Sequence, residues 1–450
     1  MAAPAAGLFI RKLEWPAGQA SAHDVFARAP QQFAALLEDA AGGGRQFLVS
    51  RAGRTISTSS PLERQGFFSQ WKQQLASVLE ERDAGMGIRC LVYAAYEAGG
   101  LLETLPAPRT TPPGPLLWLL LPDWSCCFVP EEEVVYLVSA RDEAQLDAAE
   151  SILLNASERQ GANAVTVEMD SVSVSDPDSY RQAVRRVKDY IRAGDIFQAN
   201  IARFWNVPMA ASQLPALYAH LRQVNPAPFS CFVRIEAGDD LLHIVSASPE
   251  RLFRISADGM VETRPIAGTR KRSSGIRDDQ LRQELLLSDK ERAEHIMLLD
   301  LERNDLGRVC RPGTIHVNEH MAIERYATVQ HIVSNVRGEL GEGMDAADVF
   351  CAMFPGGTIT GCPKVRCMEI IHELEPGARG PYTGGIGYVA WDGSADMNIL
   401  IRTFWHHRKM LHWAAGAGIV ADSSPEHELR ETGYKAAGLL WALSRPEQHA

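Results

Sequence analysis

A run of strand-forming residues from Leu241 to Arg264, LLHIVSASPERLFRISADGMVETR, constrains the fold more than any other stretch of this chain. It predicts successive β-strands, and Asp258-Gly259 is a turn pair typical of a hairpin. Upstream, apolar residues between Tyr180 and Ile191 recur at helical spacing, and we expect Gly194 to end that helix. Hairpins beside long helices predict an α+β fold with antiparallel or mixed sheets. A Rossmann domain is not expected, because no G-x-G-x-x-G motif follows a strand.

Composition and charge exclude several classes of protein. The chain has 450 residues and a formal net charge of −11, so its field repels the phosphates of nucleic acids. Its longest apolar run, Leu116–Leu121, is far shorter than the roughly 20 residues needed to cross a bilayer. The N-terminus shows no signal segment, and the eight cysteines form no C-x-x-C pair. We therefore expect a cytoplasmic protein with reduced thiols that binds neither nucleic acid nor membrane.

Two polar connectors divide the chain. Pro106–Pro115 is rich in proline, and Asp170–Ser179 is rich in serine and aspartate. We predict an N-terminal region over residues 1–170 and a second region over residues 178–447. The second region has the stronger periodicity and carries nearly all of the motifs with chemical character.

Three carboxylates in the second region invite two interpretations. Glu294 falls on the apolar stripe of a predicted helix, where an unpaired carboxylate is costly. Glu428, Glu431 and Lys435 share one face of a helix that begins at Ser424. Salt bridges and an exposed ion-pair ladder are the structural interpretation. The functional interpretation is a Mg²⁺ site built from hard oxygen ligands, since no His or Cys stands among the three predicted ligands.

Other polar or small residues are weaker signals by themselves. Gly416 and Gly418 can let backbone N–H groups approach an anion, although tight packing explains them equally well. His331 lies in a strand-like run, where a buried structural histidine is common. Arg402 lies in an apolar strand and needs a partner, in either the protein or a ligand. The glycine-rich turn at Met353–Ile370 lacks a complete phosphate-loop motif.

Eight motifs, in order along the chain, carry a family resemblance: GDIFQANIA, ASPERLF, TRPIAGT, AEHIMLLDLERNDLGRV, FPGGTITGCPKVRCMEIIHELEP, PYTGGIGY, ILIRT and GAGIVADSSPEHELRET. From about Asp178 to Leu443 the chain resembles the chorismate-utilising family, which includes component I of anthranilate synthase and of aminodeoxychorismate synthase, and the isochorismate and salicylate synthases. The N-terminal third matches more loosely, through VYAAYEAGG and LPDW. The resemblance implies one composite fold of two large packed sheets with helices outside. Residues 178–447 are then the chorismate-binding catalytic domain.

The same resemblance implies a site for chorismate and Mg²⁺. The implied metal ligands are Glu294, Glu428 and Glu431. The implied catalytic residues are Gln198, Glu250, Thr269 and His331, with His331 assisting departure of the ring hydroxyl and Glu250 a candidate proton shuttle. The implied substrate-binding residues are Gly268, Thr269, Tyr382, Arg402, Gly416, Ala417, Gly418 and Lys435.

Within the family, one position bears on the nucleophile and another on the product. Isochorismate and salicylate synthases carry a water-activating Lys where this chain has Gln198, so the resemblance implies ammonia as the nucleophile. No glutaminase motif is present, which implies a separate glutamine amidotransferase subunit. FQAN, SPER and FPGGTITG resemble aminodeoxychorismate synthases. Ala267 resembles anthranilate synthases instead, because many aminodeoxychorismate synthases have a Lys there that forms an adduct with the substrate.

Two further hypotheses stand beside 4-amino-4-deoxychorismate as the product. Anthranilate is the alternative product, and a non-catalytic scaffold subunit is the alternative class. The Leu-Leu-Glu-Ser motif of tryptophan feedback is not recognised, and FLVSR stands near its place. A candidate tryptophan site nevertheless comprises Ser50, Pro228, Phe229 and Ser230.

Overall fold

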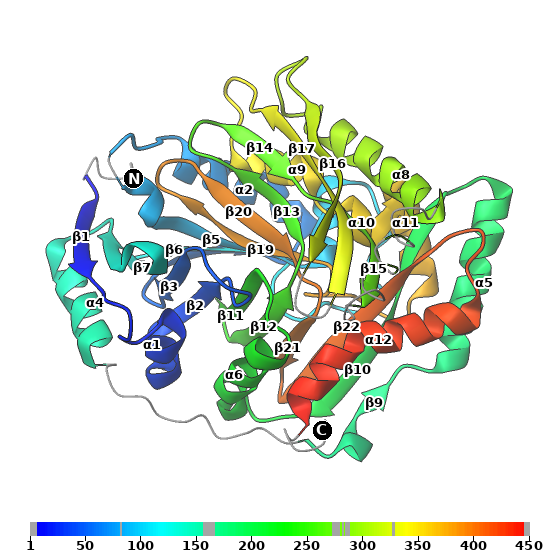
Figure 1. The fold of residues 1–450 in the computed structure, drawn as a ribbon, viewed down its shortest axis with the longest axis horizontal. Coiled ribbons are helices and arrows are strands. Elements are labelled where there is room, and N and C mark those ends of the chain that lie inside the picture. Colours follow the sequence, from blue (N-terminus) through cyan, green and yellow to red (C-terminus); the bar gives the residue numbers. More distant parts are fainter. Residues whose placement is uncertain are drawn as a thin grey trace.

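The computed structural model of this chain consists of two large antiparallel sheets with helices on the outside (Figure 1). The structure describes residues 7–81, 83–155, 167–271, 280, 283, 289–325 and 329–444. Every strand pairing among the described residues is antiparallel. The predicted α+β architecture is therefore confirmed, with antiparallel rather than mixed sheets.

The first sheet has 12 strands among the described residues and holds the centre of the site described below. Its N-terminal half and its C-terminal half meet where β2 pairs with β11. In spatial order the strands are β1 (Phe9–Glu14), β8 (Val134–Ser139), β7 (Trp124–Val129), β3 (Gln46–Ser50), β2 (Phe33–Glu38), β11 (Phe229–Ala237), β12 (Asp240–Ser248), β21 (Thr403–His407), β22 (Met410–Ile419), β10 (Gln198–Pro208) and β18 (Gly361–Cys362), with β9 (Ser173–Val174) beside β10.

The second sheet has ten strands in the described part of the chain and contains the hairpin predicted from sequence. Gly259 has a φ of +78°, and its N–H donates to the Ser256 carbonyl, so it closes the turn between β13 and β14. In spatial order the strands are β15 (Ile266–Lys271), β17 (Val329–Glu339), β14 (Met260–Thr263), β13 (Arg251–Ile255), β20 (Ala395–Ile399), β19 (Gly385–Ala390), β5 (Ile88–Ala94), β6 (Leu117–Pro122) and β4 (Gly53–Thr58), with β16 (His316–Arg325) beside β17.

Helices cover the outer faces of the sheets. The predicted helix begins at Pro177, where the Asp176 side chain accepts a hydrogen bond from the Ser179 N–H, and ends at Gly194 in the left-handed conformation. The helices are α1 (Ala22–Arg28), α2 (Arg64–Leu75), α3 (Gly99–Leu102), α4 (Glu143–Asn155), α5 (Pro177–Ala193), α6 (Leu214–Val224), α8 (Asp289–Leu306), α9 (Ala346–Met353), α10 (Gly357–Thr360), α11 (Lys364–Leu374) and α12 (Pro425–Leu443).

The two predicted regions share both sheets. Strands β1, β2, β3, β7 and β8 of the first region continue the sheet that holds β10 and β22, while β4, β5 and β6 continue the sheet that holds β13 to β15. One core cluster contains Phe47, Tyr93, Trp118 and Ile244, which come from strands of both sheets and both regions. The N-terminal region is thus built into the same packed body as the C-terminal one.

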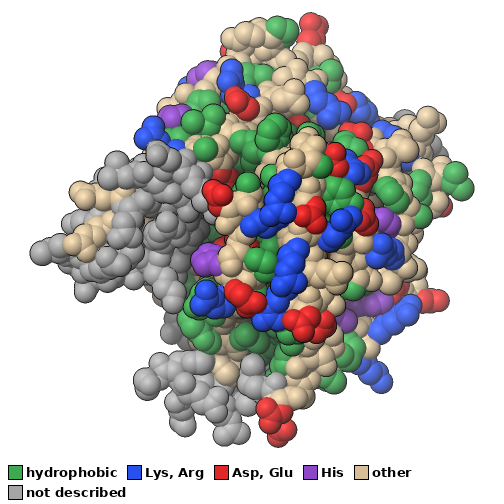
Figure 2. Space-filling view, turned by 90° about the vertical axis from the view of Figure 1, so that its right-hand side faces the viewer, with side chains coloured by type: hydrophobic (Ala, Val, Ile, Leu, Met, Phe, Trp, Pro, Cys, Tyr) green, Lys and Arg blue, Asp and Glu red, His purple; other side chains and the backbone are tan. Residues whose placement is uncertain are grey.

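Surface charge and helix composition add two observations. Among the described residues on the face shown in Figure 2, Lys and Arg side chains are interspersed with Asp and Glu side chains, so these residues form no broad basic field. Elsewhere among the described residues, opposite charges pair directly, as in Arg181–Glu426 and Arg366–Asp195. Within the described ranges, none of the helices has both the length and the apolar character that a bilayer crossing demands.

A buried acidic pair lies on the inner face of α8. Glu302 and Asp305 are 5% and 4% exposed. Lys364 Nζ donates to Asp305 Oδ2 at 2.6 Å and to the Met353 carbonyl at 3.1 Å. Burial, followed by the neighbouring Asp305 carboxylate, raises the pKa of Glu302 to about 8. Glu302 is therefore a largely neutral acid at pH 7.

Replacing Glu302 by Gln is expected to remove a pH-dependent loss of stability. Between pH 4.5 and about 8 the unfolded chain has lost this proton while the folded chain keeps it. Wild-type stability therefore falls as pH rises through this window, by up to about 1.4 kcal/mol per pH unit from this group. Urea unfolding at pH 5 and pH 8 measures the difference, with Glu342→Gln on the exposed surface as control. Equal pH slopes for Glu302→Gln and wild type would contradict the assignment.

Candidate active site

The site is organised by the ladder between β10 and β22. Asn200 lies opposite Gly418, and Ala202 lies opposite Gly416. Gln198 and Asn200 are two residues apart on β10, so their side chains leave the same face of the sheet. Both side chains are buried, with 4% and 8% of each residue exposed. The ladder thus places two neutral amides over a glycine-rich strand.

Gly416 and Gly418 are required by close approach. A Cβ at Gly416 would lie 2.3 Å from Asn200 Oδ1 and 2.8 Å from the Tyr382 hydroxyl oxygen. A Cβ at Gly418 would lie 2.4 Å from Gln198 Nε2 and 3.7 Å from Glu294 Oε1. Ala417, between them, is fully buried in the core. The two glycines therefore form a cradle around which Gln198, Asn200, Tyr382 and Glu294 converge.

The predicted metal ligands come from α8 and α12. Glu428 and Glu431, one turn apart on α12, form with His427 a group whose ligand atoms lie within 4.8 Å of one another. Glu428 is buried, with 3% exposed, whereas His427 is exposed. Glu294 is not a member of this group, and its Oε1 accepts a hydrogen bond from Gln198 Nε2 at 2.9 Å. The structure thus places Glu294 on the amide side of the cradle.

Cations lie around the same cradle. Lys435 Nζ donates to the Gly416 carbonyl at 3.1 Å and pairs with Glu431 Oε1 at 2.8 Å. Glu431 and Lys435, two of the three residues in the predicted ladder on α12, therefore form an ion pair, as the structural interpretation expected. Arg402 has a φ of +50°, and its carbonyl accepts from the Ala247 N–H, which anchors the bend that carries its side chain. Tyr382 is 3% exposed and accepts a hydrogen bond from the Gly416 N–H.

Two buried titratable residues face these cations. Burial raises the pKa of Glu250 to about 7, and the positive charges of Lys435 and Arg402 partly offset that rise. Burial and the Arg402 charge lower the pKa of His331 to about 4, although a hydrogen bond to the Gly268 backbone acts in the opposite direction. At pH 7 the Glu250 side chain is poised between its two forms, and His331 is a neutral imidazole.

The second half of the TRPIAGT motif, Ile266–Thr269, lies on β15 at the edge of the second sheet. In the ladder with β17, Thr269 pairs with His331 and Ala267 pairs with Ile332, with an irregularity between them. Gly268 occupies that irregularity with a φ of +65°, a conformation that favours glycine. The backbone of the motif therefore runs beside His331, while the side chains of Ala267 and Thr269 lie outside the described set.

The candidate tryptophan residues do not form one cluster. Ser230 lies opposite Glu38 on β2, and Ser50 lies opposite Phe33 on the other side of the same strand. These two positions on β2, Glu38 and Phe33, are five residues apart, which is roughly 16 Å along the strand. The Ser230 hydroxyl donates to the Ala227 carbonyl, and the Ser50 hydroxyl donates to the Ala52 carbonyl. Pro228 and Phe229 are half-buried, and the Arg251 guanidinium stacks over the Phe229 ring at 5.1 Å.

The segment beside Ser230 is one that the sequence analysis overlooked. It reads Leu-Leu-Glu-Asp, from Leu36 to Asp39, and differs in its last residue from the Leu-Leu-Glu-Ser motif. FLVSR lies on the next strand out. The Glu38 carboxylate is fully engaged, because it accepts hydrogen bonds from Tyr218 at 2.6 Å and from Arg222 at 2.9 and 3.0 Å. A search for this tetrapeptide with one mismatch would have found the segment.

Comparisons with known proteins agree with this architecture. The family described as chorismate binding enzyme matches residues 33–440. An anthranilate synthase component I-like protein of Synechocystis is 42% identical over 78% of this chain and 72% of its own length. Aminodeoxychorismate synthase component 1 of Bacillus subtilis is 48% identical over 60% of this chain and 57% of its own length. Anthranilate synthase component 1 of Thermus thermophilus is 44% identical over 79% and 77%.

Solved structures extend the comparison to the whole fold. Anthranilate synthase component I from Streptococcus pneumoniae superposes with a TM-score of 0.75 at 27% identity, covering 87% of this chain and 91% of that one. The menaquinone-specific isochorismate synthase of Escherichia coli has the same TM-score, 0.75, at 19% identity over 98% and 95%, a likeness of fold alone. Because the family match spans most of its length, the chain belongs to the chorismate-binding enzymes, among relatives named as component I of anthranilate and aminodeoxychorismate synthases.

Proposed function

We propose that this chain is the component I subunit of an aminodeoxychorismate synthase. In this reaction ammonia replaces the ring hydroxyl of chorismate, giving 4-amino-4-deoxychorismate and water. The observation that carries the proposal is the Gln198 amide, whose Nε2 donates to Glu294 at 2.9 Å. This bond fixes the amide with its oxygen turned away from the carboxylate. A neutral amide has no basic group with which to activate water, so it suits a nucleophile that is already reactive.

Acceptor atoms on β10 support ammonia as that nucleophile. Gln198 Oε1 and Asn200 Oδ1 are buried, and neither has a hydrogen-bond partner among the described residues. Buried acceptors without partners are costly, so a ligand with N–H donors is favoured there. Ammonia supplies such donors and keeps its lone pair for attack on the ring. We assign Gln198 and Asn200 to holding the nucleophile.

Mg²⁺ fits the residues that surround the cradle. Glu428 is a carboxylate with 3% of the residue exposed, and His427 approaches it only at 3.8 Å from the protein surface. Carboxylate oxygens are the ligands that Mg²⁺ prefers, and the ion typically keeps several open positions for water or substrate. Glu294, Glu428 and Glu431 would hold the ion. When bound, Mg²⁺ supplies positive charge that anchors the substrate carboxylate and polarises the conjugated ring.

The remaining residues have distinct assigned roles. Arg402, Tyr382, Lys435 and the Gly416 and Gly418 backbones bind the carboxylates of chorismate. Glu250, with a pKa near 7, donates a proton so that the ring hydroxyl leaves as water. The attacking nitrogen then loses a proton, which restores Glu250. His331, a neutral imidazole at pH 7 that pairs with Thr269 across the β15–β17 ladder, assists departure of the ring hydroxyl.

A glutamine amidotransferase subunit is the proposed partner and ammonia source. The Bacillus subtilis and Thermus thermophilus relatives are both named component 1, which implies a second component for each. The same two relatives support two products, 4-amino-4-deoxychorismate and anthranilate. Ala267 favours anthranilate as the alternative, because no lysine is present to block ring carbon 2.

Removing one metal ligand is expected to abolish turnover without unfolding the protein. Glu294→Gln should lower kcat roughly 100-fold or more in chelator-treated, Mg²⁺-titrated assays, because charge stabilisation at the substrate is lost. Glu426→Gln is the matched control, since Glu426 lies on α12, is exposed and pairs with Arg181. Wild-type activity and an unchanged Mg²⁺ midpoint in Glu294→Gln would refute the metal assignment.

Adding one methyl group to the cradle should impair the site specifically. In Gly418→Ala the new Cβ displaces the Gln198 amide, which is 2.4 Å away, and breaks its bond to Glu294. We expect a loss in kcat of roughly 100-fold from misplacement of the nucleophile. Gly433→Ala on α12, where a Cβ meets nothing within 4 Å, is the control and should retain activity. Equal activities of the two variants would show that the amide position is unimportant.

A product assay decides between the candidate functions. The purified chain is incubated with chorismate, Mg²⁺ and ammonium at alkaline pH, with and without an added aminodeoxychorismate lyase. We expect para-aminobenzoate to form only when the lyase is present. Fluorescent anthranilate as the main product without lyase would establish the alternative, and calorimetric heat on adding tryptophan would reinforce it. Chorismate left intact under all conditions would favour a non-catalytic scaffold.

A further inference from the structure

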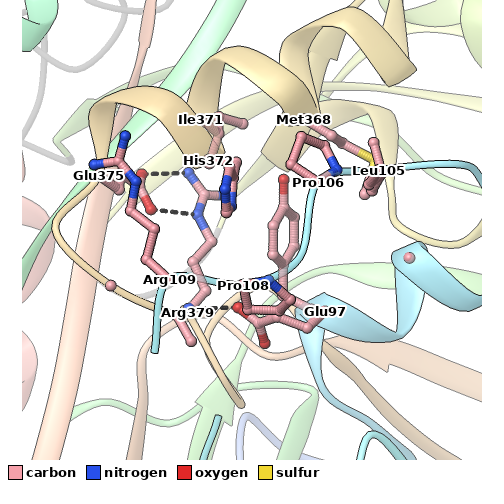
Figure 3. Close-up of a pocket in the computed structure, with 14 residues that line it drawn as sticks. Glu97, Leu105, Pro106, Pro108, Arg109, Met368, Ile371, His372, Glu375 and Arg379 are labelled. Atoms are coloured by element: carbon pink, nitrogen blue, oxygen red, sulfur yellow. Dashed lines mark hydrogen bonds and ion pairs between the residues drawn. The ribbon is translucent and has the colours of Figure 1, made fainter. Parts of the chain in front are cut away.

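A buried ion pair lies against the backbone of β10, the strand that carries Gln198 and Asn200. Glu375, at the C-terminal end of α11, and Arg379, four residues later, are 2% and 1% exposed at their side chains. Arg379 Nε donates to Glu375 Oε2 at 2.9 Å and Arg379 Nη2 to Glu375 Oε1 at 2.6 Å, a two-point contact. Figure 3 shows the pair at the wall of a pocket lined by Leu105, Pro106 and Met368.

The pair bonds to two separate walls of the site. On β10, Glu375 Oε1 accepts from the Ala202 N–H at 2.9 Å, and Arg379 Nη2 donates to the Asn200 carbonyl at 2.7 Å. On the turn before β19, Arg379 Nη1 donates to the Thr383 hydroxyl at 3.2 Å, and that hydroxyl donates to the Tyr382 carbonyl. The guanidinium also lies 5.7 Å from the centre of the Tyr382 ring.

Arginine suits this position for a geometric reason. Its guanidinium has five N–H donors in a rigid plane. Here the fork reaches Glu375 twice and also Asn200, Thr383 and the Ile359 carbonyl, so its donors are directed at several segments at once. Lysine would keep the positive charge but carries its donors on one flexible atom. A buried ion pair often contributes little net stability, so its geometric role is the more informative one.

We propose that Glu375 and Arg379 are positioning residues for chorismate amination, which fix the Tyr382 wall relative to the Asn200 strand. Neither residue touches the cradle itself. The pair acts through Tyr382, which binds substrate, and through Asn200, which holds the nucleophile. The activity measurements that test this inference rest on the proposed function. The structural measurement that tests it depends on atomic positions alone.

A double-mutant cycle tests the proposal. Arg379→Lys and Tyr382→Phe are made singly and together, and kcat/KM for chorismate is measured with saturating ammonium and Mg²⁺. If Arg379 acts by placing Tyr382, then Arg379→Lys costs much less once the Tyr382 hydroxyl is gone. We expect a coupling factor of about 10 or more, in the range found for residues of one network. A factor below about 2 would overturn the proposal, because a general loss of stability multiplies independently of Tyr382.

Two further variants sharpen this test. Thr383→Val removes only the hydroxyl that links Arg379 to Tyr382, so it serves if Arg379→Lys does not fold, and the same coupling is expected. Arg222→Lys is the control, because Arg222 also contacts a buried glutamate at two points, but on α6 and β2. We expect the fold-loss in kcat/KM caused by Arg222→Lys to multiply with that of Tyr382→Phe, so that the coupling factor is close to 1.

A crystal structure of Arg379→Lys gives a readout that does not depend on the reaction. We expect the Tyr382 hydroxyl to leave the Gly416 N–H, and the distance between Tyr382 and Asn200 to change. If wild type consumes no chorismate, the proposed function fails and this structure alone decides the positioning proposal. Unmoved Tyr382 and Asn200 side chains in Arg379→Lys would refute it.

Discussion

The pairing of β10 with β22 is the constraint on which the rest of the site depends. A shift of one residue along β10 would turn Gln198 and Asn200 to the opposite face of the sheet, and the same shift along β22 would turn Gly416 and Gly418 away from them. The observed register sets both amides against Gly416 and Gly418, where any larger residue would collide with them. Glu294 reaches the cradle from α8 and Lys435 from α12, each through a hydrogen bond to this ladder. The helices thus bring charge to a position that the sheet has already defined.

Local features of the fold could be read from the sequence because their causes are local. The helix that ends at Gly194 and the hairpin at Gly259 depend on periodicity and on residues that accept a positive φ. The order of strands could not be read in this way. Region 1–170 adds strands to both sheets, and pairings such as β2 with β11 join residues almost 200 positions apart. Such contacts leave no periodic trace in either segment.

In the site, too, some residues could be predicted from the sequence and others could not. The motifs that carry the family resemblance pointed to Glu294, Tyr382, Gly416, Gly418 and Lys435, and contacts in the structure bring these five to one cradle. The Glu375–Arg379 pair was missed, although it stands at helical spacing in the sequence. That spacing usually means an exposed ion pair, and only the packed fold shows that both side chains are buried against β10. Burial depends on tertiary packing, so the sequence spacing alone cannot distinguish a buried positioning residue from a solvent-exposed one.

The arrangement of charge bears on which ring carbon of chorismate the proposed amination would attack. The proposed anchors for the substrate carboxylates come from β22, α12 and the segments at Tyr382 and Arg402, whereas the proposed holders of ammonia both lie on β10. Under the proposed function, the ring carbon attacked depends on the angle between these two groups of rigid elements. A lysine at position 267 would act from a third element, β15, by occupying one carbon. With alanine there, the proposed function makes selectivity depend on the placement of β10 relative to Tyr382, which is the relation that the Glu375–Arg379 pair spans.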